Sequence, residues 1–269
     1  MSLKIIKEGL VKFWKNPLII FPFILSVLAT IIISTPFMLY LFSAVSKLGL
    51  SEADLMNQKT LANSLVSIVN PTLVIFAIIT FLAIIFLFCY FSAGAFGIAL
   101  EIAKNKKPKL KDTFSFGRKF WFRYFVIYFL IFLIFFALLI IGGLIFGNST
   151  ASTTGNVLFN IYTFASMFFM ILFISSFVIV ILQNCKSVEA IKKSFIVSRK
   201  NYLSLLIISL LFYIATIAVE YIPLNWIALA INFAFLYPAF VITLALFALN
   251  AIGKKEPVEE EKKIAKKSK

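Results

Sequence analysis

The sequence predicts an all-α, polytopic membrane protein with six transmembrane helices arranged as three hairpins. Hydrophobic residues make up 62% of the chain and charged residues only 14%, whereas about a quarter of a typical soluble domain is charged. The apolar residues also form runs of about 20 or more, the length that a helix needs to cross a bilayer core. Uninterrupted runs favour helices over the alternating segments of a membrane barrel.

Basic residues separate the apolar runs and predict their orientation. Of the 26 Lys and Arg residues, 24 lie in residues 1–17, 104–123, 184–202 and 253–269. Because Lys and Arg concentrate in cytoplasmic loops, we expect these blocks and both termini on the cytoplasmic side of a cell membrane. The same rule accounts for the net charge of +15 without nucleic acid as a partner.

The apolar runs place the six spans in order. The first run, after Pro17, is about 26 residues long and predicts a retained span rather than a secretory signal peptide. The second exceeds the bilayer thickness at about 1.5 Å per residue, so we expect it to tilt or to project. The predicted spans are 17–42, 71–103, 120–146, 157–183, 203–222 and 226–252.

A basic block precedes each predicted hairpin, and its residue pattern predicts a cytoplasmic, interfacial amphipathic helix. In residues 3–16 the apolar Leu3, Ile6, Leu10 and Phe13 recur at steps of three and four, with lysines on another face, and residues 109–121 and 187–201 are similar. Helices of this kind lie in the interface with their lysines among the headgroups. The candidates for binding anionic lipid headgroups or a protein partner are Lys7, Lys15, Lys111, Arg118, Lys119, Lys192, Arg199 and Lys200.

Shifts of 81 and 104 positions superimpose these three blocks without gaps. The superposition aligns the basic Lys7, Lys111 and Lys192 and the small Gly9, Thr113 and Ser194. Either the chain contains an internal repeat, or basic amphipathic helices simply align at some shift. The repeat is the favoured interpretation.

The predicted organisation is a single transmembrane domain over residues 1–252. Its repeat units are about 3–103, 107–183 and 187–252, and a charged, mobile cytoplasmic tail follows at 253–269. The outer loops are 43–70, 147–156 and 223–225, and the second of them carries an N-glycosylation pattern at Asn148.

The stretch 187–202, SVEAIKKSFIVSRKNY, is similar to a recurring cytoplasmic segment of a loose group of membrane proteins. The group includes the membrane domain found with some glycerophosphoryl diester phosphodiesterases and uncharacterised archaeal and bacterial six-span proteins. The resemblance implies a six-helix membrane bundle. It transfers no catalytic residue, because the phosphodiesterase chemistry belongs to a separate soluble domain.

The side-chain inventory argues against enzyme chemistry and bound cofactors. The chain has no histidine and two cysteines, Cys89 and Cys185, which the predicted topology places at different depths. Metal ligands are therefore scarce, and no nucleophile, base and orienting group occur together. We expect a non-enzymatic protein without a cofactor.

Two functions remain open at this point. The first is an integral membrane protein whose basic helices bind anionic lipid or a cytoplasmic partner and organise the membrane. The second is a transporter, or a transporter subunit, for a hydrophobic small molecule or lipid, with a possible outer polar site at Glu220, Asn232 and Asn160. The plainer roles of these residues are snorkelling to water for Glu220 and interhelical hydrogen bonding for the asparagines.

Overall fold

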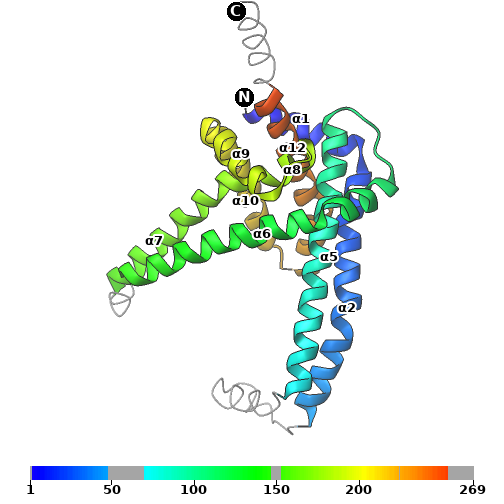
Figure 1. The fold of residues 1–269 in the computed structure, drawn as a ribbon, viewed down its shortest axis with the longest axis vertical. Coiled ribbons are helices and arrows are strands. Elements are labelled where there is room, and N and C mark those ends of the chain that lie inside the picture. Colours follow the sequence, from blue (N-terminus) through cyan, green and yellow to red (C-terminus); the bar gives the residue numbers. More distant parts are fainter. Residues whose placement is uncertain (1, 48–69, 147–152, 224, 254–269) are drawn as a thin grey trace, which may run out of the picture. The chain divides into compact units, whose positions relative to one another are not determined.

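The computed structural model describes residues 2–47, 70–146, 153–223 and 225–253, and within them the chain is helical, with no strand (Figure 1). Most of the predicted loops at 43–70 and 147–156, including Asn148, and all but the first residue of the tail lie outside these residues. Residues 153–156 of the second predicted loop instead begin a helix, α7. The elements are α1 (Ser2–Lys15), η1 (Pro17–Ile20), α2 (Phe21–Ser46), α5 (Pro71–Ala103), α6 (Leu110–Phe146), α7 (Thr153–Met170), η3 (Ile171–Phe173), α8 (Ser176–Leu182), α9 (Ser187–Lys200), α10 (Tyr202–Glu220), α11 (Asn225–Ile231), η4 (Asn232–Leu236) and α12 (Tyr237–Gly253).

Six stretches of helix are long and apolar enough to cross a membrane. They are Pro17–Ser46, Pro71–Ala103, Leu110–Ile145, Val157–Leu182, Tyr202–Glu220 and Ile227–Ile252. The prediction of a multi-pass helical membrane protein is confirmed. The observed bounds lie close to the predicted ones, except that the third stretch begins at Leu110 rather than at Phe120.

The third stretch begins early because of the residue that lies between its basic block and its span. After the first and third blocks the helix breaks at an asparagine: Asn16 Nδ2 donates to the Lys12 carbonyl (2.9 Å) and Asn201 Nδ2 donates to the Val197 carbonyl (3.0 Å). Such side-chain bonds compete with helix continuation. The aligned position in the second block is the buried Phe120, and there the predicted separate helix at 109–121 continues into the span as one helix, α6.

Contacts group the chain into two compact units, residues 1–24 with 90–269 (unit 1) and residues 25–89 (unit 2). In unit 2 the ring of Phe76 on α5 meets the rings of Phe37 and Tyr40 on α2 edge-on, with centroids 5.7 and 5.9 Å apart. Offset and edge-on ring pairs of this kind add to the stability gained by burial. The prediction of one domain over 1–252 stays a prediction.

The core of unit 1 lies where the end of α5 and α8 meet α6. Phe96 of α5 stacks on Phe177 of α8 with centroids 5.7 Å apart, and the fully buried Tyr124 of α6 contacts both rings. The Tyr124 hydroxyl donates to the Phe177 carbonyl. Because the phenol is buried, this bond satisfies a donor that would otherwise destabilise the fold.

Small residues bring each basic block close to a spanning helix of unit 1. Gly9 of α1 packs on Thr243 of α12, and Thr113 of α6 lies so close to Gly94 of α5 that a Cβ there would be 2.7 Å from the Thr113 carbonyl oxygen. The Ser194 hydroxyl of α9 donates to the Leu172 carbonyl at 2.8 Å. Gly9, Thr113 and Ser194 are the three small positions that the superposition aligns.

The contact at Gly9 predicts that adding one methyl group at this position destabilises the fold. A Cβ at Gly9 would overlap the Thr243 hydroxyl oxygen and lie 3.2 Å from the Thr243 Cα. Since overpacking costs roughly 1–3 kcal/mol, we expect Gly9→Ala to lower the thermal unfolding temperature in detergent. Gly143→Ala is the matched control, because a Cβ at Gly143 meets no atom within 4 Å. Equal unfolding temperatures for the two variants would contradict the packing argument.

Candidate functional site

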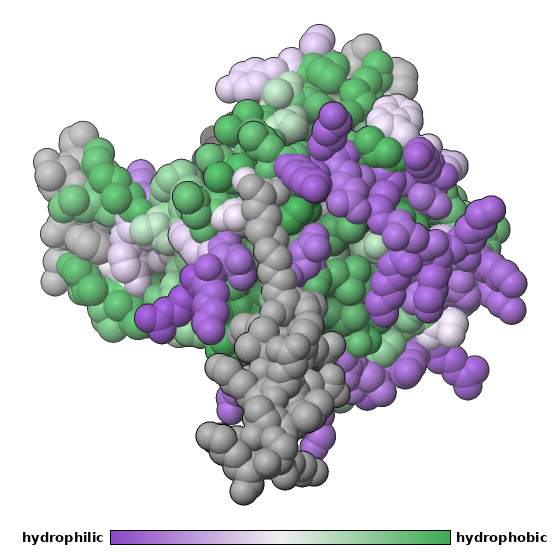
Figure 2. Space-filling view, turned by 90° about the horizontal axis from the view of Figure 1, so that it is seen from above, coloured by the Kyte–Doolittle hydropathy of each residue, from purple (hydrophilic) through white to green (hydrophobic). Residues whose placement is uncertain are grey.

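The basic segments of unit 1 contact neighbouring helices near the ends of the spans. The Lys12 ammonium of α1 donates to the Ala103 carbonyl at the end of α5 (2.9 Å), and the Ser187 hydroxyl of α9 donates to the Arg123 carbonyl of α6 (3.0 Å). Figure 2 shows hydrophilic side chains gathered on this side of the molecule. We refer to the eight candidate cations on α1, on the start of α6 and on α9 as the basic face: Lys7, Lys15, Lys111, Arg118, Lys119, Lys192, Arg199 and Lys200.

All eight predicted candidates are exposed. Within the described part of the chain, none of them forms an ion pair. Lys119 lies 5.1 Å from the centre of the Phe120 ring, which attracts the ammonium without neutralising it. The basic face therefore presents cations whose charge is unbalanced among the described residues.

Nearby acidic residues are held by other partners. The Lys193 ammonium, through its hydrogen bond and its charge, holds the pKa of the Glu189 carboxyl below its ordinary value. The contacts are Glu8 with Lys12 (3.4 Å), Glu101 with Lys106 (3.2 Å), Glu189 with Lys193 (2.7 Å), and Asp112 Oδ2 accepting from the Lys109 amide (2.7 Å). The three glutamates are thus paired with lysines outside the basic face, whereas the neutral amide leaves the charge of Asp112 in place.

Two further cations point inward, at the ends of spanning helices. Lys12 donates to Asn105 Oδ1 at 2.7 Å, after α5, and Arg123 donates to Asn184 Oδ1 at 2.9 Å and to the Cys185 carbonyl at 3.2 Å, after α8. Both asparagines have positive φ, 60° and 47°, a conformation that asparagine tolerates at helix ends. The cations thus lie at the negative ends of the helix dipoles.

We call these two contacts, of Lys12 after α5 and of Arg123 after α8, the first and the second cap. The sequence analysis did not predict them because it placed every cation at the surface. The available signal was a single asparagine after each apolar run, at Asn105 and Asn184, which is a recognised helix stop. Next to the second cap, burial raises the pKa of the Cys185 thiol. Such a thiol is a poor nucleophile.

A hollow lies within the basic face, lined by Tyr90, Phe114, Ser115, Arg118 and Lys119. The Tyr90 hydroxyl donates to the Phe114 carbonyl at 3.1 Å, which ties the end of α5 to the start of α6. The two cations and the serine hydroxyl can donate to the oxygens of a phosphate group. The aromatic rings of Tyr90 and Phe114 can contact apolar atoms next to that phosphate.

The structure places the three residues of the predicted outer polar site in different surroundings. Glu220 is exposed at the end of α10, and Asn160 is exposed on α7. Asn232 is buried in the π-helical segment η4, and its side-chain oxygen has no hydrogen-bond partner among the described residues. The role of these residues in a common polar site stays a prediction.

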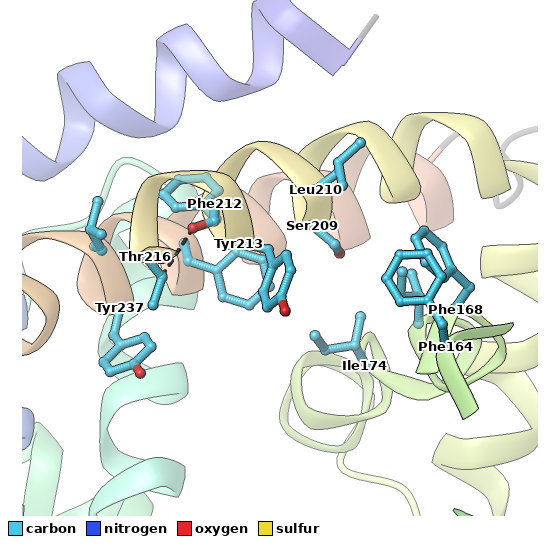
Figure 3. Close-up of a pocket in the computed structure, with 12 residues that line it drawn as sticks. Phe164, Phe168, Ile174, Ser209, Leu210, Phe212, Tyr213, Thr216 and Tyr237 are labelled. Atoms are coloured by element: carbon cyan, nitrogen blue, oxygen red, sulfur yellow. Dashed lines mark hydrogen bonds between the residues drawn. The ribbon is translucent and has the colours of Figure 1, made fainter. Parts of the chain in front are cut away.

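A cavity of about 460 Å³ lies between α7, α10 and α12 (Figure 3). Phe164, Phe168 and Ile174 line one side, and Ser209, Tyr213 and Tyr237 supply hydroxyl groups. Sequence analysis did not predict this cavity. Ser209, Tyr213 and Thr216 follow one another at steps of four and three in the fifth span, which places them on one helical face.

Comparisons with known proteins add no assignment. No protein-family model, curated protein or solved structure matches the chain. The resemblance of residues 187–202 to the phosphodiesterase-associated membrane domain therefore stays a prediction. Among the described residues, no three His, Cys, Asp or Glu side chains lie close enough together to hold a metal ion.

The first cap gives a prediction that distinguishes two contributions of Asn105 to stability, its backbone conformation and its side-chain hydrogen bond. Asn105→Ala places a residue with a Cβ atom but no polar side chain at positive φ, which costs about 1–2 kcal/mol of stability. It also removes the hydrogen bond to Lys12. Asn105→Gly removes the bond but accepts the conformation. We expect the Ala variant to unfold at a lower temperature than the Gly variant, with both below wild type. Equal losses would show that the conformation of residue 105 contributes nothing.

Proposed function

We propose that this protein is a non-enzymatic integral membrane protein whose basic face binds anionic lipid headgroups at the cytoplasmic surface of the cell membrane. The observation that carries the proposal is the set of eight exposed cations that form no ion pair within the described part of the chain, beside glutamates that are paired with other lysines. Each such cation near an anionic membrane surface contributes about 1 kcal/mol. A lipid-ordering role follows from binding several headgroups at once.

Lipid is favoured over a soluble protein partner because the basic segments also expose apolar side chains. Leu3 and Trp14 of α1 are each 70% exposed, and Leu110 and Phe114 at the start of α6 are also exposed. The face of α1 that packs inside the protein is instead Ser2, Ile5, Gly9 and Phe13. Exposed cations next to exposed apolar residues, directly before a span, suit the boundary between headgroups and acyl chains.

The hollow lined by Arg118 and Lys119 is the proposed seat for one headgroup phosphate. Its cations can donate to phosphate oxygens, and Phe114 and Tyr90 can contact the glycerol and the first methylene groups of the same lipid. The aligned positions Lys7, Lys111 and Lys192 lie exposed on their three segments. Their common exposure supports the proposed threefold repeat and three similar contacts with lipid.

The cavity favours a second candidate function, the movement of a hydrophobic small molecule or lipid through the membrane. It lies between three spanning segments, where transporters commonly bind their substrates. The exposed Glu220 and Asn160 do not line it. A transport function would therefore use a site other than the outer polar residues considered from the sequence.

The proposed orientation is tested with single cysteines in a variant that lacks Cys89 and Cys185. We expect Lys47→Cys and Tyr221→Cys to react with a membrane-impermeant maleimide on intact cells, because both positions are exposed at the proposed outer ends of spans. Lys4→Cys and Lys192→Cys should react only after the cells are opened. Labelling of Lys192→Cys on intact cells would overturn the cytoplasmic placement of the basic face.

Lipid binding is tested with two arginines of one helix. We expect Arg118→Gln to weaken binding of phosphatidylglycerol to the detergent-solubilised protein about fivefold, since one cation contributes about 1 kcal/mol. Titration of the lipid, followed by the rise in unfolding temperature, gives the dissociation constant. High salt should weaken the binding further.

Arg123→Gln is the matched control for this measurement. Arg123 caps α8 instead of facing the headgroups, so its loss should lower the unfolding temperature without changing lipid affinity. Equal binding of phosphatidylglycerol and the zwitterionic phosphatidylcholine by wild type would rule out recognition of anionic lipid. A protein partner would then be the better explanation of the basic face.

A further inference from the structure

The cavity between α7, α10 and α12 lies near the middle of three spans. Its lining residues Phe168, Ser209 and Tyr237 fall near the centres of Val157–Leu182, Tyr202–Glu220 and Ile227–Ile252, respectively. Hydrocarbon surrounds this level of a membrane protein. Leu210 and Tyr213, which also line the cavity, are 39% and 57% exposed on α10, so the cavity is open to the surrounding lipid rather than to water.

Two of these three spans lose regular α-helical geometry at the cavity. The fourth span changes to the 3₁₀ segment η3 at Ile171–Phe173, and the sixth contains the π-helical segment η4 at Asn232–Leu236. Ile171 and Leu236 both line the cavity. Short π segments are frequent at functional sites, and interrupted helices form the binding sites of many transporters.

Hydroxyl groups without partners face this apolar space. The Ser209 hydroxyl oxygen is buried and has no hydrogen-bond partner among the residues that the structure describes, and Figure 3 shows it turned from α10 toward Phe168 and Ile174. The structure gives no hydrogen bond within the described residues to the hydroxyls of Tyr213 and Tyr237, which also line the cavity. A hydroxyl in hydrocarbon is costly without an acceptor, so these groups favour a ligand that carries an oxygen atom.

We propose that this cavity binds a neutral, single-chain lipid with a hydroxyl group at its polar end. The aromatic walls, including Phe164, Phe168 and Phe240, suit an aliphatic chain. At roughly 30 Å³ for a group the size of water or methylene, 460 Å³ holds about fifteen such groups. None of the described residues that line the cavity is Lys or Arg, so a lipid alcohol fits it and an ionised fatty acid does not.

The assignment goes beyond the basic face, which recognises charge at the membrane surface. It specifies the ligand of the second candidate function without requiring transport, because a lipid can stay bound as a structural component. The two sites use different residues, and the basic face binds a charged group whereas the cavity binds a neutral one. A variant of one should therefore leave the other unchanged.

The test is photolabelling of the full chain in nanodiscs with dodecanol that carries a diazirine on its chain. We expect labelled peptides from α7, α10 and α12, and loss of the label when unlabelled dodecanol competes. Dodecanoic acid at a pH where it is ionised should compete at least tenfold less well. Ser209→Ala should weaken binding about threefold to tenfold, as expected for one hydrogen bond.

Two adjacent leucines provide the matched variants. Leu210 and Leu211 have similar exposure, 39% and 43%, but only Leu210 lines the cavity. Leu210→Trp should reduce labelling at least fivefold, whereas Leu211→Trp and the basic-face variant Arg118→Gln should leave it unchanged. Equal labelling of the two Trp variants, or label spread over all six spans, would overturn the site. Equal competition by the acid would overturn its assignment to a neutral lipid.

Discussion

The ends of the spanning helices impose the constraint on which the arrangement of unit 1 depends. The last carbonyl groups of a helix have no partner inside that helix. At the end of α5 the Ala103 carbonyl accepts from the Lys12 ammonium of α1, and in the segment after α8 the Asn184 side chain and the Cys185 carbonyl accept from Arg123 of α6. Since each cap joins helices distant in the sequence, the bonds that satisfy the backbone also hold the basic segments beside the spans.

This constraint divides the cations by role. Lys12 and Arg123 point inward and act on helix ends, and their charge is offset by the helix dipoles and, for Lys12, by Glu8. The cations of the basic face point outward and have no such compensation among the described residues. A side chain that the fold does not use, and that its acidic neighbours do not neutralise, is available to an external anion. The proposal of lipid binding rests on this difference, and not on the total charge of the chain.

The six spans could be predicted because hydrophobicity and length decide them almost alone. The break between block and span could not be predicted uniformly, because it depends on one residue. Asn16 and Asn201 end their helices, whereas Phe120 at the aligned position is buried and the helix continues. The sequence also could not predict which face of α1 is buried. Gly9 faces the protein because it packs on Thr243, which belongs to a helix distant in the sequence. The cavity was missed for the same reason, because its residues come from three spans.

The position of the cavity has a local cause in the sixth span. Pro238 has no amide hydrogen, so the carbonyl four residues before it, at Ala234, loses its regular α-helical partner. Ala234 lies within the π-helical segment η4, where the hydrogen-bond register differs from that of an α-helix. The wider turn displaces the side chains that follow, and Leu236 and Tyr237 line the cavity there. A proline placed in the middle of a span thus creates space inside the membrane, and Ser209 on the facing helix supplies a hydroxyl group in that space to which a ligand can bond.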